Sequence, residues 1–460
     1  MALSRILDRL GLHRPELRAW AMYDWANSAM VTVIMTAVFP PFFSAVAASN
    51  LTPQQATARF GIATTLCIVV VAVSAPLLGA IADFAGIKKR LLAIFMVFGA
   101  SAVASMFLLR HGDWLAAAVL FACANIGATG SFVFYDALLP HIAKGQELDR
   151  VSTAGYALGY IGGGILLALN LMWITQPQWF GLPAGDGVTP TQATLPVRLS
   201  FLSVAIWWLG FSIPLFRRVS EPPRRLEPDE GIGQSALRVA RARLRETFGE
   251  LRQYRHAFVL LLAFLLYNDG INTIIRMATI YGAEIGVERD TMILAVMITQ
   301  FVGVPFAFLF GLLSGALGAK RSILLGLFAY MGITVLGYFM TNATHFLMLA
   351  VLVGMVQGGT QALSRSLFAS MIPSHKSGEF FGFFGVMERF GGSLGTGVMT
   401  ALSLATGSSR NGILAIILFF VAGAFLLRKV DVAEGQRAAR AADAHLHPAT
   451  ESNQQSVTEA

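Results

Sequence analysis

GAIADFAGIKK, residues 79–89, is the stretch of sequence that decides the fold. It lies between two long apolar runs, and a related stretch, GLLSGALGAKR at residues 311–321, follows 232 residues later between two more. Glycines allow a tight turn, and an acid near a helix end can hold cationic groups of a neighbouring helix in one conformer. We therefore expect a gating latch rather than a solute site. Its candidate gating residues are Gly79, Asp83, Gly86 and Lys88.

A second pair of short stretches supports an internal duplication. Leu139-Pro140-His141 closes one apolar run, and Ile372-Pro373-Ser374 closes another 233 residues further along. Two markers at nearly one offset predict that the chain consists of two related six-span units.

The composition indicates a protein that is solvated by lipid. The chain has 460 residues, of which 55% are hydrophobic and only 13% are charged, whereas soluble domains carry about 25% charged residues. Its two cysteines, Cys67 and Cys123, lie in apolar runs without the spacing of a metal or redox site, so we interpret them as small core residues.

Twelve apolar runs have the length of about 20 residues that a helix needs to cross a bilayer. Backbone groups in hydrocarbon must be hydrogen-bonded within their own segment, so each run predicts a helix. The predicted fold class is an all-α membrane protein with twelve transmembrane helices in two six-helix bundles. The predicted spans lie near 19–46, 59–82, 91–109, 114–140, 152–175, 197–216, 257–282, 291–314, 322–340, 345–372, 381–405 and 411–428.

Lys and Arg collect in alternate loops, which predicts a multi-pass protein of the cell (inner) membrane with both termini in the cytoplasm. The segment between the halves holds ten arginines, and we expect a solvated loop that touches anionic lipid headgroups rather than nucleic acid. The domains that we predict are a cytoplasmic segment at 1–18, bundles at 19–216 and 257–428, an Arg-rich linker at 217–256 and a disordered cytoplasmic tail at 429–460.

The first glycine-rich stretch resembles the signature of the major facilitator superfamily, Gly-x3-Asp-x2-Gly-x-Arg/Lys-Arg/Lys. The second copy departs from it, because Gly315 stands where the signature has its acid. This resemblance implies a transporter that works by alternating access, with spans one, four, seven and ten around a central cavity.

Four further blocks resemble one branch of that superfamily, the vacuole-effluxer-like (autophagy-related protein 22-like) family. The branch includes a fungal protein described as an amino-acid effluxer of the vacuole, so the resemblance supports the mechanism better than the cargo. The blocks are WAMYDWANSA at 20–29, GYALGY at 155–160, LYNDG at 266–270 and QGGTQALSRS at 357–366.

Charged and amide side chains within the spans are the candidate solute-binding residues. A charge at the middle of a bilayer costs about 2.5–3.5 kcal/mol on insertion scales, so each one needs a partner or a water-filled cavity. Helical spacing places most of these side chains on shared stripes. The candidates are Tyr23, Asp24, Asn27, Asn268, Asp269, Asn272, Arg276, Gln357, Gln361 and Arg365.

These charges predict a zwitterionic cargo. Arg276 and Arg365 would anchor a carboxylate, and Asp24 or Asp269 would bind an ammonium group. The rival interpretation is that the charges pair with one another, hold the two bundles together and never touch the solute.

Carboxyl groups in the spans also leave proton coupling open. Asp24, Asp136, Asp269 or Glu388 could each cycle a proton between conformers. Two of these carboxyl groups equally suit gating or structural ion pairs: Asp136, near the end of span four, and Glu388, beside Arg389 in span eleven. We favour the structural role for both.

The sequence predicts a transporter and not an enzyme. It has no nucleophile constellation, phosphate-binding loop or metal-ligand spacing, so we expect no cofactor. One rival keeps the fold and changes the cargo to a sugar or drug, since Gln357, Gln361, Asn268 and Asn272 suit hydroxyl groups. The other rival is a membrane sensor that binds a solute without transporting it.

Overall fold

The computed structural model describes residues 7–8, 10–185, 187–224, 235–249, 253–406 and 409–445. Within these ranges every regular element is a helix. The expectations for 225–234, in the linker, and for 446–460, in the tail, lie outside the described residues.

The first six spans form one bundle. Span one bends through π-helical turns where Pro40 and Pro41 remove two backbone donors. The bundle consists of α2 (Pro15–Ala29) continued by η1 (Met30–Val38), α3 (Phe39–Phe42) and η2 (Phe43–Ala47), then α4 (Pro53–Ala85), α5 (Lys88–Ser105) with η3 (Met106–Leu108), α6 (Trp114–Ile142), α7 (Gln146–Thr175) and α9 (Leu195–Arg218).

The last six spans form the second bundle, which contains one broken span. Where we expected a continuous helix at 381–405, the chain forms two helices of 14 residues each that meet at Gly391 and Gly392. Eleven helices of the described chain are therefore long enough to cross a membrane unbroken, and the two short helices together make the twelfth span. The elements are α11 (Arg255–Glu284), α12 (Arg289–Leu317), α13 (Ala319–Tyr338), α14 (Ala343–Ala369), η6 (Ser374–Lys376), α15 (Ser377–Phe390), α16 (Ser393–Thr406) and α17 (Ser409–Arg428).

Local sequence sets where the helices begin and end. Thr52 caps the N-terminus of α4 through a reciprocal pair of hydrogen bonds with Gln55. The same helix ends at Gly86, whose φ of +65° suits glycine. Gly318, between α12 and α13, has a φ of +85° at the corresponding turn of the second half. Both duplicated glycines therefore use a positive φ, but their turns differ, because ψ is 43° at Gly86 and 149° at Gly318.

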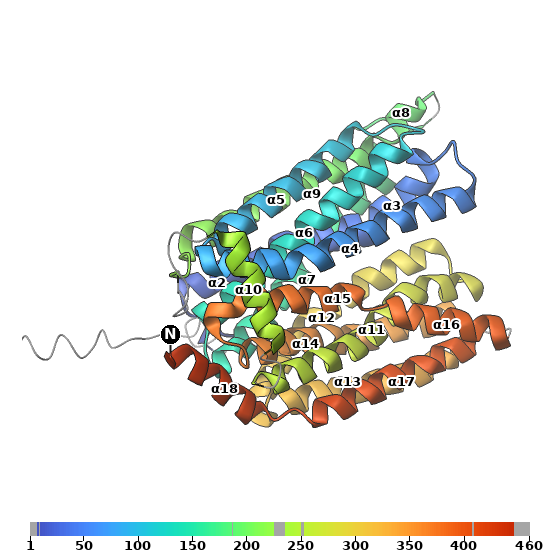
Figure 1. Cartoon of the computed structure of the whole chain (residues 1–460). Coiled ribbons are helices and arrows are strands. Elements are labelled where there is room, and N and C mark those ends of the chain that lie inside the picture. The colour runs from blue at the N-terminus through green and yellow to red at the C-terminus, as the bar shows by residue number, and fades with distance from the viewer. Residues whose placement is uncertain are drawn as a thin grey trace, which may run out of the picture.

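Figure 1 shows the two bundles lying side by side, with the amino-terminal half above and the carboxy-terminal half below. At one end of the molecule lie two further helices, α10 (Ala236–Gly249) and α18 (Val432–His445), and we call this the linker end. At the opposite end, the loop end, lies the short helix α8 (Pro190–Ala193). The ribbons of the two bundles diverge towards the loop end (Figure 1).

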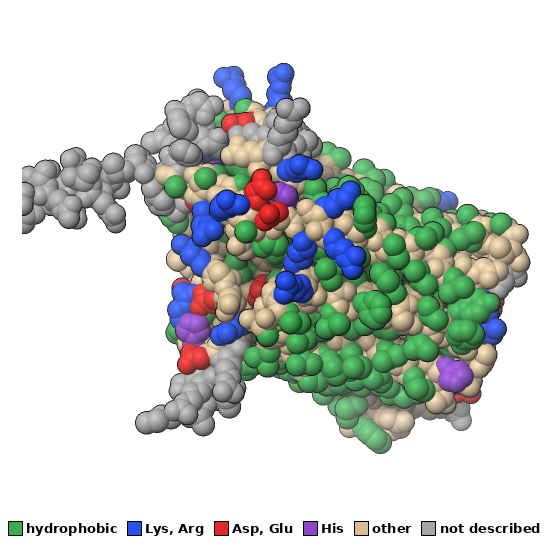
Figure 2. All heavy atoms as spheres, turned by 90° about the horizontal axis from the view of Figure 1, so that it is seen from below, with side chains coloured by type: hydrophobic (Ala, Val, Ile, Leu, Met, Phe, Trp, Pro, Cys, Tyr) green, Lys and Arg blue, Asp and Glu red, His purple; other side chains and the backbone are tan. Residues whose placement is uncertain are grey.

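The middle of the outer surface is apolar, while basic side chains gather towards the linker end (Figure 2). Exposed Ile, Leu, Val and Phe side chains cover the outer faces of α5, α9, α13 and α17, for example Phe98, Ile206, Phe328 and Phe425. A wide apolar surface of this kind suits lipid rather than water.

The tail beyond residue 429 is not disordered throughout, because α18 packs against the linker end. Its Asp443 accepts hydrogen bonds from the backbone N–H and the hydroxyl group of Ser374, and Gln436 donates to Ser370. The linker likewise contains a helix, α10, in which Val239 and Ala240 are buried. Each helix has an apolar side to bury, which compositional reasoning about a polar segment overlooked.

Candidate functional site

The centre of the site is a cluster of charges that joins the two bundles. Arg365, on α14, lies with its Nη2 3.1 Å from Asp24 Oδ2 on α2 and its Nη1 3.1 Å from Asp136 Oδ1 on α6. Its Nε donates to the Ser152 hydroxyl on α7 at 2.9 Å. The Tyr135 hydroxyl donates to Asp24 Oδ2 at 2.9 Å. We call Asp24, Asp136, Ser152 and Arg365 the charge cluster.

Aromatic rings enclose the Arg365 guanidinium in the charge cluster. Its Cζ lies 4.9 Å from the ring centroid of Trp20, 4.7 Å from that of Tyr156 and 5.6 Å from that of Tyr135. Arg365 is only 2% exposed, and Asp24 and Asp136 are 4% and 6% exposed. Ring faces attract a desolvated cation, so these contacts add to the two ion pairs.

Three of the predicted solute-binding residues lie on α2 and contact different partners. Asp24 belongs to the charge cluster, whereas Asn27 donates to the Ser131 hydroxyl within its own bundle at 3.3 Å. Tyr23 is fully buried between the rings of Phe132 and Tyr135.

A second group of predicted residues holds the break in the eleventh span. The backbone N–H groups of Leu394 and Gly395, at the start of α16, donate to the Asp269 carboxylate. The Asn268 side chain donates to the Glu388 carbonyl oxygen, at the end of α15, at 3.2 Å. One pair of residues on α11 thus satisfies backbone groups on both sides of the break, as hydrocarbon surroundings require.

Neighbouring amide side chains form further hydrogen bonds with Asn268, next to the break. Gln361 donates to Asn268 Oδ1 at 3.2 Å, and Asn272 donates to the Asn268 carbonyl oxygen at 3.0 Å. Gln357 is half-buried on α14. Most of the amides that we predicted to bind solute therefore bond to one another or to the backbone.

Charged side chains surround the break on the side that faces the other bundle. Glu388 and Arg389 lie in the last turn of α15, and both are half-buried. Arg389 Nη1 lies 4.0 Å from the sulfur of Met35 in the opposite bundle. A Cβ atom on Gly392 would lie 3.3 Å from Nε of Arg276, so this guanidinium lies directly over the break.

Four of the predicted gating residues, Gly79, Asp83, Gly86 and Lys88, lie at or beside a contact between the bundles at the linker end, which we call the latch. Asp83 Oδ1 lies 2.6 Å from Nζ of Lys88, and the carboxylate accepts the backbone N–H groups of Gly378 and Glu379 at 3.0 and 2.9 Å. We expected cationic groups of a neighbouring helix there. The acid pairs with Lys88, the first residue of the neighbouring helix α5, and also caps the N-terminus of α15.

Gly79 lets α4 and α15 approach closely at the latch. A Cβ atom at this position would lie 2.1 Å from the carbonyl oxygen of Gly378, which no side chain can do. The close approach explains why the pattern begins with a glycine.

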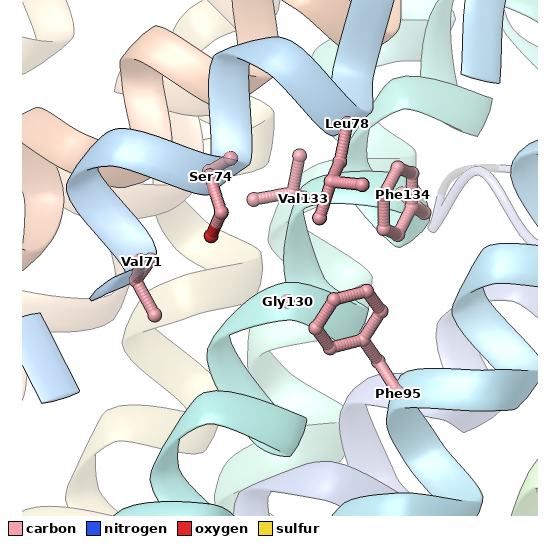
Figure 3. A pocket seen from close by; sticks show the side chains of 8 residues that line it. Val71, Ser74, Leu78, Phe95, Gly130, Val133 and Phe134 are labelled. Carbon is pink, nitrogen blue, oxygen red and sulfur yellow. The ribbon is translucent and has the colours of Figure 1, made fainter. Parts of the chain in front are cut away.

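A small pocket within the amino-terminal bundle does not belong to the site. Figure 3 shows that it is lined mainly by apolar side chains of α4, α5 and α6, including Val71, Phe95 and Phe134. Its volume of about 10 Å³ is that of a single water at most. Within the described ranges no group of three His, Cys, Asp or Glu side chains could hold a metal ion.

Sequence reasoning missed Ser152 and undervalued Tyr156. Charged side chains within a span stand out because burying a charge is expensive, and burying a hydroxyl group costs far less. Tyr156 lies within a block that resembles a known family, while Ser152 carries no comparable signal.

Comparison with known proteins places the chain in a family. The family model described as "Vacuole effluxer Atg22 like" matches residues 52–440.

Two relatives differ in how much of their length the chain covers. The chain is 34% identical over 410 residues to an uncharacterized MFS-type transporter, YxiO, of Bacillus subtilis, which covers 89% of this chain and 93% of that protein. It is 25% identical over 316 residues to autophagy-related protein 22 of Yarrowia lipolytica, covering 63% of this chain. The chain spans about half the length of that fungal relative, 51%.

Solved structures share the fold at low sequence identity. The major facilitator superfamily transporter FucP, in its outward conformation, matches with a TM-score of 0.64 at 15% identity, over 91% of this chain and 100% of FucP. The human organic anion transporter MFSD10 matches with a TM-score of 0.65 at 11% identity, over 90% of this chain and 99% of MFSD10.

Proposed function

Because the chain belongs to the vacuole effluxer Atg22-like family of major facilitator transporters, we propose that it is a secondary active transporter that moves a small polar solute by alternating access. Its twelve helices form the two bundles of the major facilitator fold, and it is a multi-pass membrane protein. The proposal concerns the mechanism, cargo, direction and coupling.

The charge cluster is the observation that carries the proposed mechanism. Arg365 of one bundle is held by Asp24 and Asp136 of the other, and the three side chains are buried. These ion pairs must separate before the linker end can open, since they bridge two bodies that move apart in alternating access. The cluster therefore suits a gate whose breaking is coupled to the transport cycle.

We assign the linker end to the cytoplasm of a bacterial inner membrane, which places both termini there. The excess of Lys and Arg at this end supports the orientation. In this assignment the structure is closed on the cytoplasmic side, because the latch at Asp83 also lies there.

The cargo that the site suits best is a zwitterion such as an amino acid. Glu388, Arg389 and Arg276 offer both signs of charge around the break between the bundles. A sugar would need free amides, but Asn268, Asn272 and Gln361 are engaged with one another and with the backbone. The geometry thus favours charged groups over hydroxyl groups in the cargo.

The direction that we propose is export. The family model is named for an effluxer. Gly155, Gly159, Gly163 and Gly164 of span five resemble the glycine motif of superfamily antiporters, except that Tyr160 stands where they have proline. A Cβ atom on Gly159 would lie 2.4 Å from the Ser28 hydroxyl, so spans one and five are in close contact.

The charge cluster also supports coupling to protons. Two carboxylates face one guanidinium, so the buried group carries a surplus negative charge when both acids are ionised. A proton on one of them removes the surplus and favours the closed arrangement. Acid on the cytoplasmic side should then favour closure of that side.

Reconstituted protein tests the proposed function. Proteoliposomes preloaded with one unlabelled amino acid are given the same radiolabelled compound outside, and exchange is measured across the proteinogenic amino acids, with xylose and fucose as sugar arms. We expect exchange of at least one amino acid well above empty liposomes, and stimulation of net flux by an imposed pH gradient.

Each result bears on one part of the proposal. Exchange of sugars alone would replace the cargo, and binding without any exchange would indicate a sensor. Flux that ignores the pH gradient would remove the proton from the mechanism while leaving the transporter in place.

A further inference from the structure

Two opposite charges at the break, Glu388 and Arg389, attract each other but form no direct ion pair with any described residue. Within the described part of the chain, no hydrogen bond or ion pair reaches the Glu388 carboxylate, and the Arg389 guanidinium makes only the long contact to Met35 sulfur. The Nε atom of Arg389 is buried without a hydrogen-bond partner. A charge at this depth costs about 2.5–3.5 kcal/mol on insertion scales, so a further charged partner would stabilise both groups.

Asn268 and Asp269 of α11, which we call the clamp, fix the backbone of the residues that carry these charges. Asn268 bonds the carbonyl oxygen of Glu388 itself, and Asp269 caps the helix that starts on the other side of the break. Gly392 adopts a φ of +86°, which side chains rarely tolerate, so the break is built into the sequence. A discontinuous helix in the middle of a transporter commonly carries a ligand site.

The break faces the opposite bundle rather than lipid. Arg389 reaches Met35 there, and Glu388 interacts electrostatically with Asp24, Asp136 and Arg365 of the charge cluster. A ligand bound at the break would therefore lie between the bundles, next to the proposed gate.

We propose that the break in the eleventh span is the cargo site, where Arg389 and Arg276 bind the carboxylate of a zwitterion and Glu388 binds its ammonium group. This inference rests on the proposed function. The charges near the break are two guanidinium groups and the carboxylates of Glu388 and Asp269, so a solute without net charge leaves the balance intact. Arg365 and Asp24 stay with the gate, in contrast to the assignment that the sequence suggested.

A pairing of probes with variants tests the site without a transport assay. Binding to purified protein is measured for each proteinogenic amino acid, for its carboxamide and for its deaminated acid. We expect wild type to bind the amino acid at least about tenfold more tightly than either derivative, because each derivative leaves one buried charge unpaired.

The variants must remove this discrimination selectively. The double variant Arg276→Met/Arg389→Met should bind the amino acid and its carboxamide equally, while Glu388→Gln should bind the amino acid and its deaminated acid equally. Arg59→Met is the matched control, since this exposed arginine lies over Trp114, 4.7 Å from its ring centroid, far along the chain from the break. It should keep the wild-type preference.

The possible outcomes distinguish a failure of this proposed site from a failure of the proposed function. If wild type binds amino acids but the variant without both Arg276 and Arg389 still rejects the carboxamide, the site at the break is overturned and transport of amino acids stands. If wild type binds no amino acid, the proposed cargo and this site fail together. A folded Arg389→Lys variant that regains part of the preference for the carboxylate supports the assignment.

Discussion

At the scale of single residues, the charge balance around Arg365 sets what each substitution should cost. Arg365→Met leaves the carboxylates of Asp24 and Asp136 facing each other in a buried site, and the loss of one partner from a buried pair costs about 3–5 kcal/mol. Asp136→Asn leaves one carboxylate for one guanidinium and should cost less than about 1.5 kcal/mol, because the amide oxygen can still accept from Nη1. Thermal or denaturant unfolding in detergent measures the loss of stability in both variants.

The combined variant provides the control for this charge balance. Asp24→Asn, Asp136→Asn and Arg365→Met together remove every charge, so the triple variant should be more stable than Arg365→Met alone. Equal losses in the single and triple variants would contradict the proposed balance.

Asp443 links α18 to the bundle through a charge outside the membrane. Burial alone would raise the pKa of this carboxyl, but hydrogen bonds from His375 and Ser374 hold it at about 2. The unfolded value is about 3.9, so the stabilisation is present above that pH and is lost as pH falls towards 2. We expect hydrogen exchange in α18, corrected for intrinsic rates, to accelerate as the pH is lowered below about 4.

Asp443→Asn should produce the same loosening at neutral pH. Loss of charged hydrogen bonds worth about 1.5 kcal/mol corresponds to roughly tenfold faster exchange in α18. Unchanged protection in this variant would show that the apolar side of α18 holds it without the carboxylate.

Sequence reasoning at this scale found the important charges and could not pair them. Asp24, Asp136 and Arg365 stood out because buried charges are expensive. Which carboxylate meets which guanidinium depends on how helices from two bundles face each other, and one sequence holds no such information. The structure pairs Arg365 with both acids, as the ion-pair alternative expects, and the zwitterion hypothesis stays a proposal.

At the scale of helices, the break between α15 and α16 depends on one capping carboxylate. Asp269→Ala leaves the backbone N–H groups of Leu394 and Gly395 without their acceptor, and loss of a helix cap costs about 1–2 kcal/mol. Asp269→Asn retains one acceptor oxygen and should lose about half as much. Thermal unfolding gives the order, and hydrogen exchange of the peptide that contains Leu394 locates the effect.

A companion substitution separates the cap from a general loss of polarity. Asn272→Ala removes a nearby hydrogen bond to the Asn268 carbonyl but leaves α16 capped. It should leave exchange at Leu394 unchanged. If Asp269→Ala also left that exchange unchanged, the cap would contribute nothing to the break.

Sequence periodicity predicted the long helices and missed the irregular ones. An apolar run of about 25 residues looks the same whether or not a helix is broken inside it, and Gly391-Gly392 alone was too weak a signal. Asn268 and Asp269 bond to backbone groups on both sides of the break, so the glycines, these two side chains and the adjacent charges form one structural unit.

At the scale of the whole molecule, the two-bundle fold could be predicted because the evidence for it is repeated along the chain. Twelve apolar runs and two markers at nearly one offset are each redundant, so an error in one span does not change the class. The relative positions of the bundles could not be predicted in the same way, because a transporter that works by alternating access adopts more than one arrangement of them. The closed linker end, held by Asp83 and Arg365, is one of them.

The orientation of that closed end is a property of the whole molecule, and labelling with an impermeant maleimide in intact cells measures it. In a background with Cys67→Ala and Cys123→Ala, single cysteines replace exposed residues at the loop end, Asn50 and Thr341, or at the linker end, Lys144 and Arg321. Because Lys and Arg favour the cytoplasm, we expect strong labelling of the loop-end pair and background labelling of the linker-end pair until the cells are permeabilised. The reverse pattern in both bundles would invert the topology and, with it, the side on which the charge cluster closes the transporter. Labelling that differed between the bundles would contradict the parallel arrangement of the duplicated halves.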